Sequence, residues 1–282
     1  MRILNIVILA LCGVLGTAAQ VTYQQADSVT ICRLLREAPQ GAGTLWFARH
    51  FKGIPYVAHT LEVNAREQLV VNTRQLDCTT LVETVAALTL SVQHGQRDWN
   101  GYLHQLRQLR YRQGIMDGYA SRLHYFSDWI VDKERMSLVN EIQQPCPPFT
   151  AVQHISANYM STHPQAYKAL KAHPELVPVI RKQEQALTGT VRRYIPKSEL
   201  KNDTKLLRES IHDGDILAIT CNKKGLEIAH LGFAVWRADG LHLLNASQLH
   251  KKVVTEPMTL YQYLLKHPSH TGIRVVRLCR KN

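Results

Sequence analysis

The residue of this 282-residue chain with the clearest potential for covalent chemistry is Cys78. Asp77 precedes it and is a good helix N-cap, because its carboxylate can accept a backbone N–H of the first turn. Apolar residues recur at helical spacing from Leu81 to Leu88, which predicts an amphipathic helix with Cys78 at its first position. The helix dipole and unpaired N–H groups there would lower the pKa of the thiol and could hold an oxyanion. Cys78 is therefore a candidate nucleophile, and the alternative is a small buried core residue.

A thiol nucleophile needs a base and a group that orients the base. His230 lies in a predicted strand, 228–236, and the hairpin signal at 237–240 joins that strand to the next one. Side chains alternate along a strand, so an even hairpin loop places Asn245 on the face of His230 and His242 on the other face. A three-residue loop would reverse this choice. The joint pattern indicates His230 as the base and Asn245 as the orienting residue.

The segment from Arg122 to Trp129 combines polar and aromatic side chains. A helix with its aromatic residues inward leaves several polar groups without a packing role. Arg122 could pair with a substrate carboxylate, and His124 or Asp128 could hydrogen-bond sugar or peptide. The alternative is a surface ion pair between Arg122 and Asp128. The candidate substrate-binding residues are Asp77, Thr79, Arg122, His124, Tyr125, Ser127 and Asp128.

The formal charge of +12 makes the chain basic, which suits nucleic acid, anionic lipid or an anionic cell-wall polymer. No basic block is interleaved with aromatic residues, so we expect no nucleic-acid partner. The histidines are scattered without ligand spacing, and we expect neither a metal nor another cofactor.

Residues 1–19 have the pattern of an export signal, with Arg2, a short apolar run and small residues before a cleavage site near Ala18 or Ala19. The apolar run is too short for a comfortable membrane span, and no later stretch is long enough. Bulky Leu11 before Cys12 disfavours lipoprotein processing. After removal of the signal, the odd number of cysteines in an oxidising compartment leaves at least one thiol unpaired.

Helices are predicted mainly in the first half of the chain and strands in the last third, which is the α+β pattern. We expect one domain over 20–282 with a helical insertion or cap at about 145–195. Predicted helices are 27–38, 44–52, 78–94, 99–110 and 260–266, and predicted strands are 60–63, 68–71, 228–236, 241–246, 252–255 and 273–278. Residues 214–219 are predicted as a turn followed by a buried strand.

Four motifs occur in one order along the chain: Asp-Cys at 77–78, Gly-Asp-Ile-Leu at 214–217, His-Leu-Gly-Phe at 230–233 and Asn-Ala-Ser at 245–247. This order resembles the NlpC-type branch of papain-like cysteine peptidases, in particular its N-acetylmuramoyl-L-alanine amidase-like members. The resemblance implies a papain-like core of helices packed on an antiparallel sheet. It also implies that Cys78 is the nucleophile, His230 the general base and Asn245 the third member. Common relatives carry Ser and Gly after Asp-Cys and His at the third position.

The resemblance further implies an exported, periplasmic bacterial enzyme that acts on peptidoglycan fragments. The expected reaction is cleavage of the N-acetylmuramoyl-L-alanine amide, with no metal. One alternative is an endopeptidase that cuts after D-glutamate in the stem peptide. Another is a module that binds muropeptides without turnover.

Overall fold

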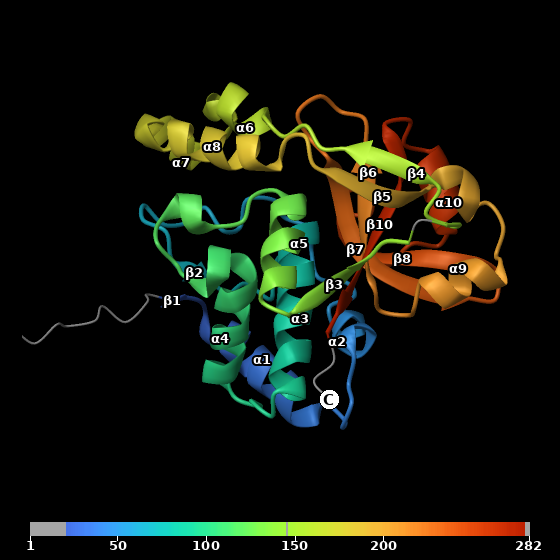
Figure 1. The fold of residues 1–282 in the computed structure, drawn as a ribbon. Helices are drawn as coiled ribbons and strands as arrows, with labels where there is room; N and C mark the ends of the chain where they lie inside the picture. The colour runs from blue at the N-terminus through green and yellow to red at the C-terminus, as the bar shows by residue number, and fades with distance from the viewer. Residues whose placement is uncertain (1–20, 145, 280–282) are drawn as a thin grey trace, which may run out of the picture.

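The computed structural model of the chain describes residues 21–144 and 146–279 (Figure 1). The predicted export signal, 1–19, lies outside these residues. Within them, no helix has both the length and the apolar content needed to cross a membrane. Figure 1 shows a helical half beside a sheet, so the predicted α+β class is confirmed.

Helix α3 lies at the centre of the helical half and is buried along almost its whole length. Its start is a capping box, in which Asp77 Oδ1 accepts the Thr80 N–H at 2.8 Å and Thr80 Oγ1 accepts the Asp77 N–H at 2.9 Å. It contacts α1, α2 and α4 as well as strands of the sheet. The helices are α1 Gln25–Glu37, α2 Thr44–His50, α3 Cys78–Gln93, α4 Trp99–Arg110 and α5 Phe126–Arg135.

The main sheet has eight strands in the order β4-β5-β10-β6-β7-β8-β9, and β3 also pairs with β10. Every pairing within it is antiparallel. The strands are β3 Val139–Ile142, β4 Ala151–His154, β5 Val191–Pro196, β6 Ile216–Cys221, β7 Ile228–Arg237, β8 Gly240–Ser247, β9 Lys252–Thr255 and β10 His270–Leu278.

Both faces of the central strands are covered, which explains why β6 and β8 are buried throughout. Leu231, Phe233 and Leu244 pack on one face, in the core that surrounds α3. Ala234 and Leu243 pack on the other face, in a core closed by α9 Lys205–Ser210 and α10 Leu260–Leu265.

The insertion is helical over 159–187, and its flanks are the strands β4 and β5. Its small core includes Tyr125 from the segment before α5, together with Met160 and Ile180. The insertion therefore packs over the loops at one end of the helical half (Figure 1). Its helices are α6 Tyr159–Thr162, α7 Lys168–Ala172 and α8 Val177–Leu187, with 3-10 turns η3 Pro164–Ala166 and η4 Pro174–Leu176.

The predicted strand at 60–63 is wrong, because the chain forms turns there and His59 adopts a left-handed φ of 61°. The predicted strand at 68–71 is β2 Leu69–Val70, which pairs in parallel with β1 Val21–Thr22. The remaining 3-10 turns are η1 Arg112–Gly114, η2 Tyr119–Ser121 and η5 Lys197–Leu200.

Candidate active site

Cys78 and His230 line one cavity of about 140 Å³. Three parts of the chain form its wall: the start of α3, the segment that leads into α5, and the start of β7. Helix α3 supplies Cys78 because its capping box fixes where the helix begins. The lining residues are Cys78, Thr79, Leu123–Phe126, Trp129 and Leu226–Leu231.

The Cys78 thiol is protonated in the resting protein. Burial, and secondly the charge of Asp77, raise the pKa of Cys78 to about 12, although hydrogen bonds from Leu231 and Thr79 oppose the rise. The predicted lowering of this pKa is therefore wrong, because desolvation outweighs the helix start. A base must therefore take this proton if the sulfur is to attack a carbonyl.

His230 is hydrogen-bonded to Asn245, with 2.9 Å between Nε2 and Oδ1. This contact follows from the sheet register. Arg237 pairs with Gly240, which leaves a two-residue turn and places Phe233 opposite Leu244. The loop is thus even, and Asn245 lies on the His230 face as the sequence predicted.

His242 points to the opposite face of β8 and is fully buried. Its Nδ1 lies 2.9 Å from the Glu256 carbonyl oxygen, and its Nε2 lies 2.9 Å from Asp239 Oδ1. His242 therefore has two partners of its own and does not contact His230.

His230 is neutral near pH 7, because burial lowers its pKa. The hydrogen bond to Asn245 and the charges of Glu256 and Asp77 act in the opposite direction and raise this pKa, but burial is the largest effect. An amide oxygen only accepts, so the neutral ring must carry its hydrogen on Nε2 and donate it to Asn245 Oδ1. Nδ1 is then the unprotonated nitrogen. The arrangement can accept a proton from a thiol in the shared cavity.

Sequence reasoning missed Glu256, which lies just beyond β9. Its carboxylate is fully buried, and Oε1 accepts a hydrogen bond from Asn245 Nδ2 at 2.9 Å. Its Oε2 lies 3.0 Å from His250 Nε2. No spacing in the sequence links Glu256 to Asn245, since the pairing of β8 with β9 brings them together.

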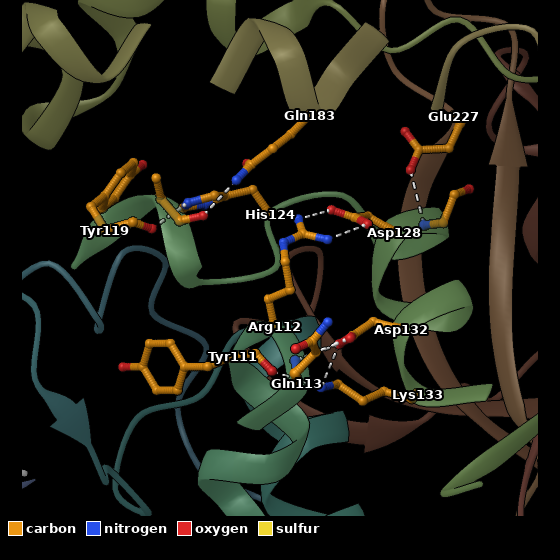
Figure 2. Close-up of polar contacts among 12 residues, drawn as sticks. Tyr111, Arg112, Gln113, Tyr119, His124, Asp128, Asp132, Lys133, Gln183 and Glu227 are labelled. Carbon is orange, nitrogen blue, oxygen red and sulfur yellow. Dashed lines mark hydrogen bonds and ion pairs between the residues drawn. The ribbon is translucent and has the colours of Figure 1, made fainter. Parts of the chain in front are cut away.

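Of the candidate substrate-binding residues in the polar–aromatic segment, two line the Cys78 cavity, namely His124 and Tyr125. His124 Nε2 donates to the Tyr119 carbonyl at 3.0 Å, and burial lowers the pKa of His124 to about 3 (Figure 2). Tyr125 OH donates to Glu184 Oε1 at 2.6 Å, which ties the insertion to the cavity wall.

The other three candidate substrate-binding residues of the segment have partners outside this cavity. Arg122 pairs with Glu62 at 2.8 Å, and the Ser127 hydroxyl accepts a hydrogen bond from Arg274 at 2.6 Å. Asp128 accepts from Arg112 Nη1 at 3.0 Å, so its ionic partner is Arg112 and not Arg122 (Figure 2). None of the three lines the Cys78 cavity.

Glu227 is a second residue that the sequence did not indicate, and it lines the Cys78 cavity. It is 3% exposed, and its Oε1 accepts the Ser127 N–H at 3.2 Å (Figure 2). Burial raises the pKa of this carboxyl. Its Oε2 has no hydrogen-bond partner among the described residues. Glu227 is thus a polar group to which a bound molecule could donate.

A larger cavity of about 680 Å³ lies between 61–67 and α7. Arg122 and Tyr119 line it, and the Tyr119 ring packs on the His124 ring with 4.4 Å between centroids. The segment from Tyr119 to His124 therefore contributes side chains to both cavities. Across the described residues, no three or more His, Cys, Asp or Glu side chains are grouped so as to hold a metal ion.

Residues 46–273 match the model of the AmiA-like family, described as N-acetylmuramoyl-L-alanine amidase-like. The chain belongs to the AmiA-like family. The matched span contains Cys78, His230 and Asn245. The chain is thus an amidase-like member of the hydrolases that act on peptidoglycan. No curated protein matches it significantly.

The chain is also similar to proteins of known structure. An N-acetylmuramoyl-L-alanine amidase from Bacteroides uniformis ATCC 8492 is 41% identical, with a TM-score of 0.79 over 85% of this chain and 99% of its own. Protein LPG0564 from Legionella pneumophila str. Philadelphia 1, of family DUF1460, shares the fold at 22% identity and a TM-score of 0.68, over 90% of this chain and 94% of its own.

A Bacteroides fragilis protein, provisionally described as a xylanase, is 42% identical, with a TM-score of 0.76 over 82% of this chain and 98% of its own. Glycoside hydrolases generally use two facing carboxylates. The Cys78 cavity of this AmiA-like chain is lined by one carboxylate, that of Glu227. Its geometry favours acyl chemistry at a thiol over glycoside hydrolysis.

Proposed function

We propose that this protein is an exported, cysteine-dependent N-acetylmuramoyl-L-alanine amidase with a papain-like, NlpC-type core. One observation carries the proposal: Cys78 at a capped helix start shares a cavity with His230, and His230 is hydrogen-bonded to Asn245. The three residue types occur in roles that acyl transfer requires. Membership of the AmiA-like family supplies the substrate class, peptidoglycan.

Because the thiol and the imidazole are both neutral at rest, proton transfer accompanies attack in this mechanism. His230 Nδ1 takes the Cys78 proton as the sulfur bonds to the lactyl carbonyl carbon. Backbone N–H groups at the start of α3 hold the oxyanion. Asn245 Oδ1 keeps the imidazolium in place through its bond to Nε2.

His230 then protonates the nitrogen of L-alanine, the C–N bond breaks, and the stem peptide leaves with a free amino terminus. A muramoyl thioester remains on Cys78. Water, deprotonated by His230, attacks this thioester and releases the lactyl carboxylate and the Cys78 thiol. One water is consumed, and no metal takes part in any step.

The size of the cavity indicates how the substrate is seated. At about 140 Å³ the cavity is smaller than the roughly 300–1,000 Å³ of pockets that enclose a whole drug-sized ligand, so it has room for the amide and its nearest neighbours. The rest of a disaccharide-peptide must extend beyond it. The insertion would act as a cap that admits only small muropeptides, because Tyr125 joins it to the cavity wall.

Export rests on the signal pattern at 1–19, and we place the mature protein in the periplasm. Without Arg2 the formal charge is 33 − 22 = +11, since the chain has 34 Lys and Arg and 22 Asp and Glu. A basic surface attracts an anionic wall polymer. Neither nucleic acid nor a lasting membrane association is part of the proposal.

Mass spectrometry of a digested disaccharide-tetrapeptide tests the bond. We expect free disaccharide and an intact tetrapeptide that begins with L-alanine. Disaccharide-dipeptide would instead identify the endopeptidase that cuts after D-glutamate. Tight binding of the intact substrate without cleavage would identify a muropeptide-binding module. Such a module would not need Cys78, His230 and Asn245, which this chain retains.

A further inference from the structure

Behind the hydrogen-bonded pair of His230 and Asn245 lies a charged group that the mechanism has not used. The Glu256 carboxylate is fully buried, and each of its oxygens has one side-chain partner. Oε1 accepts from Asn245 Nδ2 at 2.9 Å, and Oε2 lies 3.0 Å from His250 Nε2. A buried carboxylate is costly unless its oxygens are paired, so these contacts restrain both partners.

The direction of these bonds determines how the Asn245 amide lies. A carboxylate only accepts, so it requires the NH₂ group of Asn245 on its side. The Asn245 oxygen must then face His230, as observed at 2.9 Å from Nε2. With the amide reversed, an NH₂ group would face Nε2 and favour the ring tautomer that carries its hydrogen on Nδ1. That tautomer cannot accept the Cys78 proton on Nδ1.

We propose that Glu256 is a positioning residue of the active site, which holds the Asn245 amide and thereby the Nε2–H tautomer of His230. The proposal rests on the proposed function, because it assigns a role within that reaction. The negative charge of Glu256 also favours the imidazolium that forms when His230 takes a proton.

The side chain of Glu256 can be changed without removing the backbone contacts at this position. The Glu256 N–H donates to the Leu243 carbonyl at 2.8 Å, and its own carbonyl accepts from His242 Nδ1 at 2.9 Å. Glu256 makes both bonds through its main-chain atoms. A substitution therefore tests the carboxylate rather than the attachment of β9 to β8.

Several other groups face His230 and remain unchanged in such a variant. These groups therefore contribute equally to the titration of His230 in every variant that is compared. They are Asp77 and Cys78 from the start of α3, Tyr263 and His267 from α10 and the turn after it, and His270 from β10.

The test compares Glu256→Ala, Glu256→Gln and a matched control, Asp239→Asn. Asp239 accepts from His242 on the opposite face of the same strand, so its substitution removes a histidine-bound carboxylate away from His230. Two readouts are measured: the kinetics of disaccharide-tetrapeptide cleavage against pH, and the tautomer of His230 from ¹⁵N NMR of histidine-labelled protein. A His230→Gln spectrum assigns the signal.

We expect Glu256→Ala to lower kcat about 10- to 100-fold with KM changed less than about threefold, and to give a mixture of tautomers. Glu256→Gln can still accept from Asn245, so it should keep Nε2–H and recover most of kcat. Its acid limb of kcat/KM should move to lower pH by about half a unit to one unit, because the charge that favours imidazolium is gone. Asp239→Asn should change neither readout.

The proposal is overturned if Glu256→Ala keeps both the Nε2–H tautomer and kcat. It is also overturned if Glu256→Gln loses as much kcat as Glu256→Ala and leaves the acid limb in place. If Glu256→Ala fails to fold, Glu256→Gln alone decides through its tautomer and acid limb. If the unchanged protein cleaves no muropeptide, the proposed function fails, while the NMR tautomer still decides the role of Glu256.

Discussion

At the scale of single residues, the Cys78 thiol and the His230 imidazole are both neutral in the resting protein. Burial raises the pKa of Cys78 to about 12 and lowers that of His230, so a thiolate–imidazolium pair is disfavoured at rest. Leu231 and Thr79 offer hydrogen bonds to the sulfur, yet these do not offset desolvation. The thiolate is therefore expected to form only as it attacks the substrate.

This charge state predicts how Cys78 reacts with iodoacetamide in the absence of substrate. Its labelling rate should keep rising above pH 8.5, the usual thiol pKa, because the thiol holds its proton. Exposed Cys146 should be labelled first near pH 7. Peptide mapping after timed labelling measures both. Rapid labelling of Cys78 with a plateau between pH 4 and pH 6 would show a preformed ion pair instead.

The third member of the site is tested by a pair of substitutions in β8. Asn245→Ala removes the acceptor of His230 Nε2 and should lower kcat by about one to three orders of magnitude. His242→Ala removes a residue bound to Asp239 and Glu256 on the opposite face, so it should change kcat little. Steady-state kinetics on variants with normal near-UV circular dichroism measures this. The reverse ranking would make His242 the orienting residue.

At the scale of elements, the start of α3 fixes the position of Cys78. The Asp77 carboxylate accepts the Thr80 N–H at 2.8 Å, and its charge adds to the rise of the Cys78 pKa. These two effects can be separated by substitution, because an amide can cap a helix without carrying charge.

Asp77→Ala should lower the free energy of unfolding by about 1 kcal/mol, the usual value of an N-cap. Asp77→Asn should keep most of that stability while lowering the pKa of Cys78, since the neighbouring negative charge is gone. Urea unfolding and the pH dependence of Cys78 labelling measure the two effects. Equal loss of stability in both variants would mean that the cap depends on the charge.

Local patterns were sufficient to predict several of these elements. The cap and apolar spacing predicted the helix that begins at Cys78, and the even hairpin loop put Asn245 on the His230 face. Strands β3, β4 and β5 were missed, because their partners lie far along the chain.

The properties that were not predicted depend on tertiary contacts. The Cys78 pKa is set by enclosure, which residue spacing does not report. Glu256 reaches Asn245 only through the pairing of β8 with β9. Arg122 was left without a packing role because its partner Glu62 precedes it by 60 residues.

At the scale of the whole molecule, burial lowers the pKa of four histidines, His124, His230, His267 and His270, so that they are neutral in the fold. Each is expected to take up a proton near pH 6.5 in the unfolded chain. Stability is then lost as pH falls below that value. Glu67 and Glu227 act in the opposite direction, because burial raises their pKa.

His270 isolates this effect, since its pKa is lowered to about 4 and its buried Nδ1 has no hydrogen-bond partner among the described residues. His270→Gln should weaken the acid sensitivity between about pH 6.5 and pH 4, by up to about 1.4 kcal/mol per pH unit relative to the unchanged protein. Urea unfolding at several pH values measures the difference. A difference independent of pH would contradict a buried neutral His270.

The central claim is that Cys78 takes the muramoyl group of the substrate. It is tested most directly by acid-quenching the enzyme during turnover of a disaccharide-tetrapeptide and measuring the mass of the protein and its peptides. We predict a covalent adduct equal to the disaccharide acyl group, located on the peptide that contains Cys78 and absent in His230→Ala. A disaccharide-dipeptide adduct, an adduct on another residue, or turnover by Cys78→Ala would contradict the claim.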